Sequence, residues 1–407
     1  MGYKIRKLEL KSKNQGLEEF KKIGATLPGQ NIMVNKIFPV ALKVKGVKPR
    51  AADILKQEML SRMGDVVTSR DSLIQVEGNT DVIILGTEKS IRGLAEKIKC
   101  QPFGLKMLSE DITAYLSLLS ENKRQKTITI GNKVFDFSAL GCGALVMGIL
   151  NITPDSFFDG GLYNQKENAF RRAAEIVKEG ADIIDTGGMS SRPGSKPVSI
   201  DEELTRVIPA IEHIRDNFDV LVSIDTYRSE VAAEALRAGA CIVNDISGLV
   251  MDEKIVSIAA ELKASLVIMH MQGTPQTMQE NPCYNDVIDE IYDFLYSQSC
   301  AAIAAGVESS RIIIDPGIGF GKKLEHNIEI LAKLKDFTNM GFPVMAGASR
   351  KSFIGSLLGG LPADERLYGS VAAAVCAFIN GAGILRVHDV KQTVEALKIA
   401  RAVKKAT

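Results

Sequence analysis

The sequence has almost no net charge. Its 407 residues carry 50 basic and 49 acidic side chains, so the formal net charge at pH 7 is +1. A field strong enough to steer nucleic acid or an anionic membrane surface requires a large excess of one sign. We therefore expect neither nucleic acid nor a membrane as a partner, and any site for an anion must be built from a local group of cations.

The sequence also lacks paired cysteines. It has no CxxC pair and no Cys/His spacing typical of a zinc site, and a chain of this length does not need disulfides for stability. We interpret the cysteines as reduced thiols, which predicts a cytoplasmic protein. The six are Cys100, Cys142, Cys241, Cys283, Cys300 and Cys376.

Long hydrophobic runs are absent as well. No stretch of about 18 uncharged apolar residues occurs, and the basic N-terminal segment lacks the apolar run of a signal peptide. Gly2 is followed by Tyr, Lys, Ile and Arg, so the hydroxyl residue of a myristoylation signal is missing. We expect no membrane span and no lipid anchor.

A regular order of strands and helices begins at residue 144. Eight short β-branched apolar runs alternate with amphipathic segments of helical period, which is the pattern of βα units and a parallel sheet covered by helices. Eight units predict a (β/α)8 TIM barrel of about 250 residues. A doubly wound open sheet usually has fewer strands and a GxGxxG fingerprint, which is absent after the first run. The predicted strands are 144–150, 182–186, 220–225, 241–245, 265–270, 312–315, 343–347 and 384–388, and the predicted helices are 167–179, 200–216, 228–238, 252–262, 285–305, 325–335, 365–380 and 390–403.

Residues 1–120 are expected to form a smaller domain with a mixed α/β or α+β fold. Its strand-like segments are 32–44 and 81–87, and its helix-like segments are 51–63 and 88–100. No chemical motif occurs in it, and the sequence does not reveal its role. Residues 121–143 are polar and then β-patterned, so we expect a linker and a short hairpin at the base of a barrel that spans residues 144–407.

Polar residues follow the predicted strands at their C-terminal ends, where the active site of a TIM barrel is built. Asp225, Asn244 and Asp315 end the third, fourth and sixth strands. A single residue of this kind often caps the next helix. Three together suit the donor and acceptor edge of a flat polar heterocycle, because each buried ring nitrogen needs a hydrogen-bond partner.

Cationic side chains follow other strands. Arg192 comes after the second strand, Arg350 and Lys351 come after the seventh, and Arg386 and His388 lie on the eighth. The loops after strands seven and eight bind phosphate in many TIM barrels, and arginine offers phosphate a bidentate fork. Because Arg386 lies within the apolar run ILRVH, it is not expected to be a solvated surface charge. An anionic substrate or leaving group is predicted.

Other signals are less specific. Glycines such as Gly187 and Gly317 allow a backbone to approach a ligand, but they are common in barrels without one. His270 ends the fifth strand and is interpreted as a structural group. The sequence contains no Ser/His/Asp triad and no cluster with metal-ligand spacing.

An ordered series of segments is much more specific: MGILNITPDSFFDGG, IIDTGGMSSRPG, SIDT, IVNDISG, MHMQGTP, IIIDPGIGFGK, GASRKSFIG and RVHDV. In order, spacing and position on the strands, the series resembles the dihydropteroate synthase family over residues 147–400. The resemblance implies a transferase of folate biosynthesis. It would condense 6-hydroxymethyl-7,8-dihydropterin diphosphate with p-aminobenzoate to give 7,8-dihydropteroate and diphosphate, and sulfonamides would target it.

The resemblance also implies roles for single residues. The implied pterin site is Asp225, Asn244, Met269, Asp315, Lys351 and Arg386. The implied diphosphate site is Asn151, Arg192, Arg386 and His388, and the cofactor Mg²⁺ would be held by Asn151 and phosphate oxygens. The implied amine site is Phe157, Ser191, Pro193, Phe320, Lys351 and Ser352. The catalytic set would be Asp225, Lys351, Arg386 and His388.

Three residues depart from the family's usual pattern. The second loop usually reads GGESTRPG, and here Met189 replaces the Glu and Ser191 the Thr. Ser191 keeps the hydroxyl, whereas Met189 removes a charge. Phe158 stands where a Ser is usual in the first loop, which is expected to narrow the amine site or to change the affinity for sulfonamide-type mimics.

Two other functions compete with this interpretation. Methyltetrahydrofolate-dependent corrinoid methyltransferases have a similar Asp/Asn/Asp set but no diphosphate leaving group, so the basic segments SRPG, SRKS and RVHD favour the synthase. A non-catalytic pterin-binding scaffold would be indicated by loss of Asn151, Asp225 or Lys351, and all three are present. The resemblance further implies a homodimer formed through late helices; the Ala-rich segment 371–383 fits either such an interface or burial within one chain.

Overall fold

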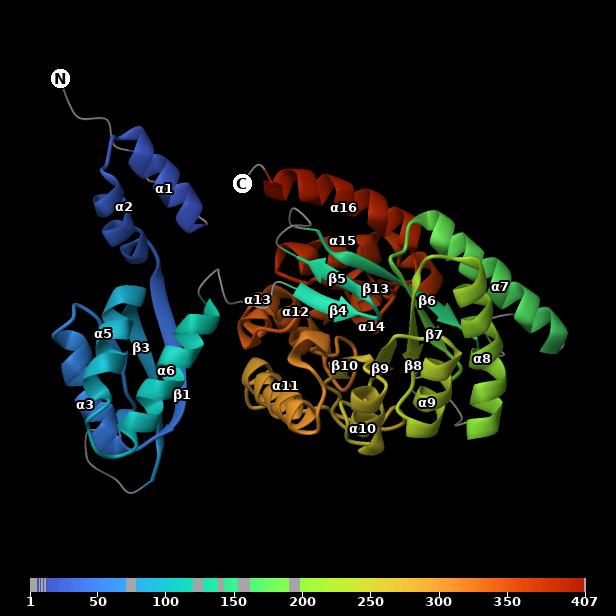
Figure 1. Cartoon of the computed structure of the whole chain (residues 1–407), viewed down its shortest axis with the longest axis horizontal. Helices are drawn as coiled ribbons and strands as arrows, with labels where there is room; N and C mark the ends of the chain where they lie inside the picture. The colour runs from blue at the N-terminus through green and yellow to red at the C-terminus, as the bar shows by residue number, and fades with distance from the viewer. Residues whose placement is uncertain are drawn as a thin grey trace. The chain divides into compact units, whose positions relative to one another are not determined.

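The computed structural model describes residues 12–70, 78–119, 127–137, 143–152, 162–189 and 198–405, together with residues 6, 8 and 10. The chain divides into two compact units, Met1–Lys123 and Arg124–Thr407. The strands of the two units form separate sheets (Figure 1), and the buried hydrophobic residues of the two units form separate clusters.

The N-terminal unit is a small α/β fold. Its helices are α1 (Lys13–Lys22), α2 (Leu27–Met33), α3 (Pro49–Leu60), α5 (Glu88–Ile98) and α6 (Leu105–Leu119), and its strands are β1 (Pro39–Val47), β2 (Asp65–Val67) and β3 (Thr80–Thr87). The strands are antiparallel in the order β1-β3-β2. Helices α1 and α6 and strand β2 lie outside the predicted segments. The predicted strand 32–44 was wrong in its first part, because residues 32–36 are helical and β1 begins at Pro39.

Alternation along β3 explains how this unit buries its core. Val82 and Ile84 point to the face where Leu55 of α3 and Ile91 of α5 pack, while Ile83 points to the other face. Helix α5 begins with a reciprocal cap, in which the side chain of Thr87 accepts a hydrogen bond from the main-chain N–H of Ser90.

The second unit is a closed parallel barrel, as predicted. Its strands are β6 (Leu145–Asn151), β7 (Ile183–Gly187), β8 (Leu221–Asp225), β9 (Ile242–Asp245), β10 (Ser265–Met269), β11 (Ile312–Asp315), β12 (Met345–Ala346) and β13 (Ile384–Val387). They are hydrogen-bonded in the order β11-β10-β9-β8-β7-β6-β13-β12. A parallel bridge between Ile314 and Val344 joins the two ends of this order, so the sheet closes. Only β12 is much shorter than expected, because its ladder with β13 spans two residues.

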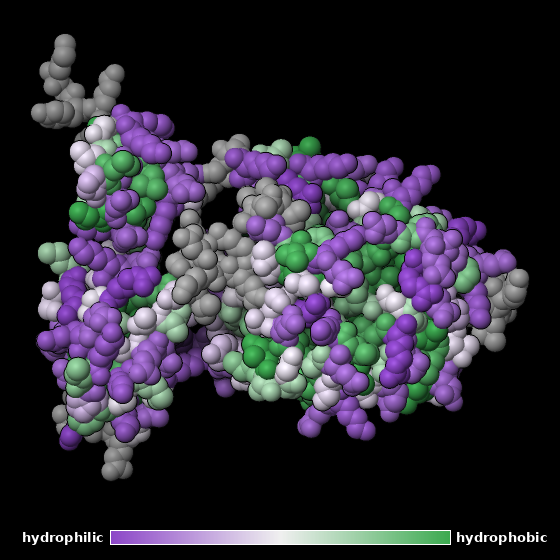
Figure 2. Space-filling model, viewed as in Figure 1, coloured by the Kyte–Doolittle hydropathy of each residue, from purple (hydrophilic) through white to green (hydrophobic). Residues whose placement is uncertain are grey.

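The eight predicted helices surround this sheet. The helices of the unit are α7 (Leu162–Glu179), α8 (Ile200–Asn217), α9 (Ser229–Ala238), α10 (Lys254–Glu261), α11 (Val287–Ala304), α12 (Leu324–Ala332), α13 (Leu334–Phe337), α14 (Ser352–Leu357), α15 (Leu367–Ile379) and α16 (Val390–Lys405). The predicted helix 325–335 is divided at Lys333, and α14 is a further short helix directly after Lys351. Helix α16 presents mainly hydrophilic residues on the outer surface (Figure 2). No helix in the described ranges has the length and apolar character needed to cross a bilayer.

A hairpin closes the N-terminal end of the barrel. It consists of β4 (Thr127–Ile130) and β5 (Lys133–Asp136), which lie in front of the barrel strands in Figure 1. Ile128 and Ile130 are fully buried against residues at the starts of the strands, such as Ile242 and Ile384. The hydroxyl of Ser265, the first residue of β10, donates to the carbonyl of Thr129 at 2.7 Å. The hairpin therefore fills the N-terminal end of the barrel. The polar residues at the strand ends lie at the opposite, C-terminal end, which we call the mouth of the barrel.

Candidate active site at the C-terminal end of the barrel

The C-terminal ends of the barrel strands bring together residues that lie far apart in the sequence. Parallel strands end on the same side of a sheet, and closure turns this edge into a ring. The polar residues on this ring are Asp185 of β7, Asp225 of β8, Asn244 of β9, Asp315 of β11 and Arg386 of β13.

Arg386 is the centre of this group. Its Nε donates to Asp185 Oδ2 at 2.6 Å, and one of its terminal nitrogens donates to Asp225 Oδ2 at 2.5 Å. Asn244 donates to the same oxygen of Asp185 at 3.1 Å. Burial by itself would lower the pKa of Arg386, but the two carboxylates outweigh it and the pKa is raised. Arg386 is therefore a permanent cation that links three strands.

Two acceptors of this group have no hydrogen-bond partner in the described part of the chain. They are Asn244 Oδ1 and Asp185 Oδ1, and both are buried. An unsatisfied buried acceptor costs about 1–3 kcal/mol, so native sites usually supply a partner. Because Asn244 also lines a pocket, a ligand N–H is the natural partner for its oxygen.

The carboxyl groups of Asp225 and Asp315 both have raised pKa values. Burial raises the pKa of Asp225 to about 7, although Arg386 opposes this shift. Burial also raises the pKa of Asp315 to about 6, against the hydrogen bond from Gly317 N–H and the charge of Lys351. Small changes in the surrounding charge therefore decide whether either group is ionised.

The pocket combines this polar edge with apolar walls. Its lining residues are Asn244, Ile246, Met269, Asp315, Ile318, Phe320, Met345, Gly347, Lys351 and Arg386. Met269 and Phe320 are buried in one cluster at the mouth. Lys351 Nζ lies 3.7 Å from the centre of the Phe320 ring, a cation–π contact. A slot with hydrogen-bonding groups at its edge and apolar side chains on its faces suits a planar heterocycle.

Asn151 lies close to this pocket, at the end of β6. A Cβ atom added to Gly187 would lie 3.6 Å from Asn151 Oδ1 and 3.6 Å from the Cβ of Asp225, so these two side chains flank the same glycine. Any larger residue at position 187 would fill the space between them. An anion that reaches the Asn151 amide would therefore also lie near the Arg386–Asp225 pair.

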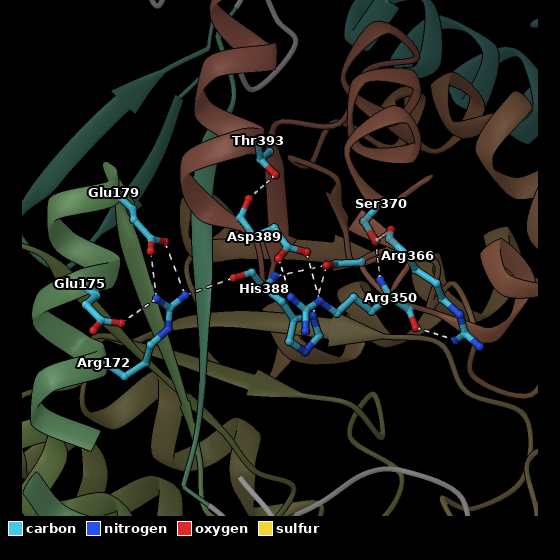
Figure 3. Close-up of polar contacts among 10 residues, drawn as sticks. Arg172, Glu175, Glu179, Arg350, Arg366, Ser370, His388, Asp389 and Thr393 are labelled. Carbon is cyan, nitrogen blue, oxygen red and sulfur yellow. Dashed lines mark hydrogen bonds and ion pairs between the residues drawn. The ribbon is translucent and has the colours of Figure 1, made fainter. Parts of the chain in front are cut away.

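His388 and Arg350 meet on the side of strands β12 and β13 (Figure 3). His388 Nδ1 lies 3.2 Å from the hydroxyl of Ser349, and Arg350 makes two hydrogen bonds to Asp389, at 3.1 and 2.5 Å. Burial, together with the charges of Arg386 and Arg350, lowers the pKa of His388 to about 3. His388 is therefore a neutral hydrogen-bonding group at physiological pH.

The backbone of Arg350 is held in a left-handed conformation, with a φ of 57°. Its N–H donates to the hydroxyl of Ser370 at 2.8 Å, and its carbonyl accepts from Arg366 at 3.0 Å, as Figure 3 shows. This conformation costs about 1 kcal/mol for a residue other than glycine, so the surrounding contacts must stabilise it. The turn directs the following residue, Lys351, to the lining of the pocket.

Most of the predicted site residues meet in this region, and some cannot be placed. Asn244, Met269, Asp315, Phe320, Lys351 and Arg386 line the pocket, and Asp225 adjoins it through Arg386. Ser352 is exposed at the start of α14 and does not line the pocket. Phe157, Ser191, Arg192 and Pro193 lie outside the described residues.

Sequence reasoning missed three contributors to the site. Asp185 was visible as the polar end of the second strand, but only the fold makes it the partner of Arg386. The pairing of Asp389 with Arg350 left no signal beyond the motif RVHDV. Lys322, in the motif PGIGFGK, is almost fully buried, with its Nζ 3.0 Å from Nδ1 of His270. His270 itself lies outside the pocket lining, as expected of a structural group.

Within the described residues, no group of three or more His, Cys, Asp or Glu side chains could hold a metal ion. Asn151, at the end of β6, offers a hard amide oxygen next to Gly187. Mg²⁺ commonly binds through one or two protein oxygens, with water and substrate phosphates completing its coordination. The residues present therefore fit a magnesium ion that arrives with a phosphate ligand, and they do not form a metal cage.

A closed βα barrel with an Asp/Asn/Asp edge, apolar faces and cations at one side defines a pterin-binding barrel. The family described as "Pterin binding enzyme" matches residues 147–388 of the chain. The dihydropteroate synthase of Synechocystis sp. is 46% identical over 276 residues, which are 68% of this chain and 94% of that protein. The chain belongs to the dihydropteroate synthase family of transferases.

A solved structure and a longer relative add to this result. The dihydropteroate synthase of Burkholderia cenocepacia, solved with 7,8-dihydropteroate, is 43% identical, has a TM-score of 0.62, and covers 69% of this chain and 97% of its own. A probable bifunctional folylpolyglutamate synthase/dihydropteroate synthase of Halobacterium salinarum is 38% identical over 358 residues, 88% of this chain and 42% of that protein. The second match is longer than the barrel unit, so it extends into the N-terminal unit.

Proposed function

We propose that the chain condenses 6-hydroxymethyl-7,8-dihydropterin diphosphate with p-aminobenzoate to give 7,8-dihydropteroate and diphosphate. The pocket lined by Asn244, Asp315, Lys351 and Arg386 carries this proposal, because it offers a heterocycle both hydrogen-bonding partners and apolar faces. The family of the chain and the 7,8-dihydropteroate bound by the Burkholderia cenocepacia relative support it.

The pterin ring would lie with its polar edge on the strand ends. The carboxylate of Asp315 accepts ring or amino N–H groups, and the unpaired oxygen of Asn244 accepts another. Lys351, held over Phe320, donates to ring acceptors from the opposite side. Met269 covers one face of the ring, where a thioether packs well against an aromatic system.

The diphosphate would lie between Asn151, Arg386 and His388, with Arg192 as a further cation. Arg386 contributes a fixed positive charge, and neutral His388 contributes a hydrogen bond. Asn151 would also hold Mg²⁺, which supplies positive charge to the phosphate oxygens when it is bound.

The reaction would replace a carbon–oxygen bond by a carbon–nitrogen bond. The bond between the pterin methylene carbon and the diphosphate oxygen breaks, and the diphosphate leaves with the electron pair. The methylene carbon gains carbocation character, which the negative charge of the Asp185 and Asp225 carboxylates would stabilise, since the two of them share a single cation, Arg386. The amine nitrogen of p-aminobenzoate attacks this carbon and then loses a proton to solvent.

The amine would lie at the outer side of the pocket. Phe320 and Lys351 border this side, Ser352 follows at the start of α14, and Phe157, Ser191 and Pro193 would complete the site from the two loops after β6 and β7. Catalysis then depends mainly on orientation and electrostatics, because the protein forms no covalent bond with either substrate.

We also propose a homodimer and a cytoplasmic location. Tyr368 and Ile379 of α15 are exposed by 85% and 59%, and Leu357 of α14 by 56%, which supports an interface on these late helices. Ala373, Ala374 and Ala377 of α15 are buried in the core of the barrel unit, whereas Ala372 is exposed. The five cysteines in the described residues are free thiols, which supports the proposed location. Light scattering of the wild type and of Tyr368→Asp would test the dimer, which the substitution should dissociate.

The reaction is tested by an assay of diphosphate release from 6-hydroxymethyl-7,8-dihydropterin diphosphate, with and without p-aminobenzoate and Mg²⁺. Release that depends on both, with formation of 7,8-dihydropteroate and its loss in Lys351→Ala, is the expected result. Methyl transfer from methyltetrahydrofolate to a corrinoid, without diphosphate release, would instead identify the rival activity. Pterin binding without either reaction would indicate a scaffold protein.

A further inference from the structure

Lys322 is a buried lysine for which the proposed reaction has no use. It ends the glycine-rich loop behind β11, and the residue is only 3% exposed. Lysine is almost never buried to this extent unless its charge is paired or fully hydrogen-bonded. It does not line the pterin pocket, so it cannot act by touching the ring.

Three acceptors surround the nitrogen of Lys322. Nζ donates to the carbonyl of Phe320 at 2.8 Å and to the carbonyl of His270 at 3.2 Å, and it lies 3.0 Å from Nδ1 of His270. An ammonium group has three donors, whereas a neutral amine has two. The arrangement therefore fits the charged form, with Nδ1 of His270 as an acceptor and the imidazole proton on Nε2.

These contacts tie the end of β10 to Asp315, the last residue of β11, and to the loop that follows it. His270 N–H donates to the carbonyl of Asp315 at 3.0 Å, and Gly317 N–H donates to the Asp315 carboxylate at 2.7 Å. Gly317 has a φ of 70°, and a Cβ atom on it would lie 1.9 Å from the carbonyl oxygen of His270 and 3.3 Å from Lys322 Nζ. The ammonium is thus packed against the amide that binds the carboxylate.

Cations from three elements face the Asp315 carboxylate. They are Lys351 from the loop after β12, Lys322 from the loop after β11, and Arg386 from β13. Lys322 is itself faced by His270, Asp315 and Lys351. Burial lowers the pKa of Lys322 to about 7, so Lys322 is mostly charged at pH 6, near the midpoint of the Asp315 titration.

We propose that Lys322 is a positioning residue of the pterin site, a buried cation that ties β10 to the loop behind β11 and favours the ionised form of Asp315. Asp315 can accept hydrogen bonds from two pterin N–H groups only as a carboxylate, because a protonated carboxyl gives up part of its acceptor capacity. This role in pterin binding rests on the proposed function, whereas the effect on Asp315 can be measured without any ligand.

The direct test is the titration of Asp315 in the ligand-free full chain. The carboxyl carbon is observed by ¹³C NMR, and its resonance is assigned by its loss in Asp315→Asn. Lys322→Gln removes the charge but keeps a donor for a nearby carbonyl, and it should raise the midpoint by about one pH unit, because a carboxylate is less stable without its neighbouring cation. Lys322→Arg keeps the charge and should stay within about 0.3 unit of the wild type.

The control is Lys333→Met, which removes an exposed lysine at the end of α12 that pairs with Glu329 at 2.7 Å. It should leave the midpoint unchanged. An unshifted midpoint in Lys322→Gln, or an equal shift in Lys322→Arg, would overturn the proposal. If Lys322→Gln and the second charge-free variant, Lys322→Met, both fail to fold while Lys322→Arg folds, the lysine serves folding alone and the proposal is also overturned.

The consequence for binding is measured by calorimetry with 6-hydroxymethyl-7,8-dihydropterin diphosphate. At pH 6 a one-unit shift reduces the ionised fraction of Asp315 about fivefold, so Lys322→Gln should bind about fivefold more weakly than the wild type. At pH 8 the two proteins should agree within about twofold. A wild type that binds no pterin at any pH contradicts the proposed function, while the carboxyl titration still decides the role of Lys322.

Discussion

Asp225 shows how a single carboxyl group of this site depends on its surroundings. Asp225 is the last residue of β8. Its Oδ2 accepts a hydrogen bond from Arg386 at 2.5 Å, and Asn151 lies on the other side of Gly187. Burial raises its pKa to about 7, and the nearby charge of Arg386 limits the rise. A carboxyl group with a raised pKa is protonated below that pKa and ionised above it, so Asp225 is the charged partner of Arg386 only at neutral pH and above.

We therefore expect kcat/KM of the wild type to rise as the pH increases through about 6 to 7, where Asp315 and Asp225 ionise. Asp225→Asn should lower kcat/KM by about 100-fold or more and should remove the upper part of this limb, since an amide carries no charge for the transition state. Steady-state assays of diphosphate release between pH 5.5 and 8.5 measure both effects. Asp219→Asn, an exposed residue just before β8, is the control and should match the wild type. A full acid limb in Asp225→Asn would contradict the assignment.

The turn at residues 349–351 shows how an element aims a functional side chain. Arg350 adopts a left-handed backbone, and its side chain forks onto Asp389 of the neighbouring strand end. The N–H and carbonyl of Arg350 are held from α15 by Ser370 and Arg366 (Figure 3). These contacts stabilise the conformation that brings Lys351 to the pocket.

Glycine adopts the left-handed conformation without strain. A glycine at position 350 therefore removes the ion pair with Asp389 but leaves the backbone of the turn unstrained. Arg350→Gly should retain more activity than Arg350→Ala, because alanine pays about 1 kcal/mol for the left-handed backbone. Asp389→Asn should lower kcat/KM about tenfold in the wild type, but it should have little further effect in Arg350→Gly, where the ion pair no longer exists. Kinetics of the four variants test this, with Glu329→Gln at an exposed ion pair as the control. Additive effects of Arg350→Gly and Asp389→Asn would refute the coupling.

The β4–β5 hairpin is an element that acts on stability and not on chemistry. Ile128 and Ile130 fill the base of the barrel and are fully buried. Ile128→Ala should lower the free energy of unfolding of the barrel by about 2–5 kcal/mol, because it removes buried methyl groups and leaves a cavity. Val134→Ala on β5, where the side chain is 66% exposed, should change it by less than about 0.5 kcal/mol. Urea denaturation measures both, and equal effects would show that the hairpin does not seal the base.

At the scale of the whole molecule, each unit has its own core. The N-terminal core includes Leu55 and Ile91, and the barrel cores contain residues of the second unit alone. The Synechocystis relative aligns over 94% of its own length with 68% of this chain, so a member of the family exists without a match to the rest.

A protein of residues 124–407 should therefore fold and keep kcat/KM within about tenfold of the full chain, because its core and its pocket are both complete. Circular dichroism, thermal melting and the diphosphate-release assay check this expectation. Residues 1–123, expressed alone, should also give a cooperative melt. Aggregation of the barrel alone would mean that the two units stabilise each other, and a folded but inactive barrel would mean that the first unit takes part in catalysis.

The sequence by itself determined the class of the barrel, its strands and the polar residues of its pocket. Strand periodicity and strand-end polarity are local properties, so eight apolar runs and their following Asp, Asn and Arg residues could be found without a structure. Asn244, Asp315, Lys351 and Arg386 were predicted on this basis and line one pocket. The split of the helix at Lys333 and the short α14 were missed, because helix ends depend on contacts of single residues.

Only the tertiary structure decided which side chains meet. The pairing of Arg386 with Asp185 joins residues 201 positions apart, and that of Lys322 with His270 joins residues 52 positions apart. Closure of the barrel and the register between its strands bring these partners within hydrogen-bond distance, and no local pattern encodes either. The same closure creates the N-terminal base that the β4–β5 hairpin fills. It also creates the ring of C-terminal strand ends on which Arg386 meets its carboxylate partners.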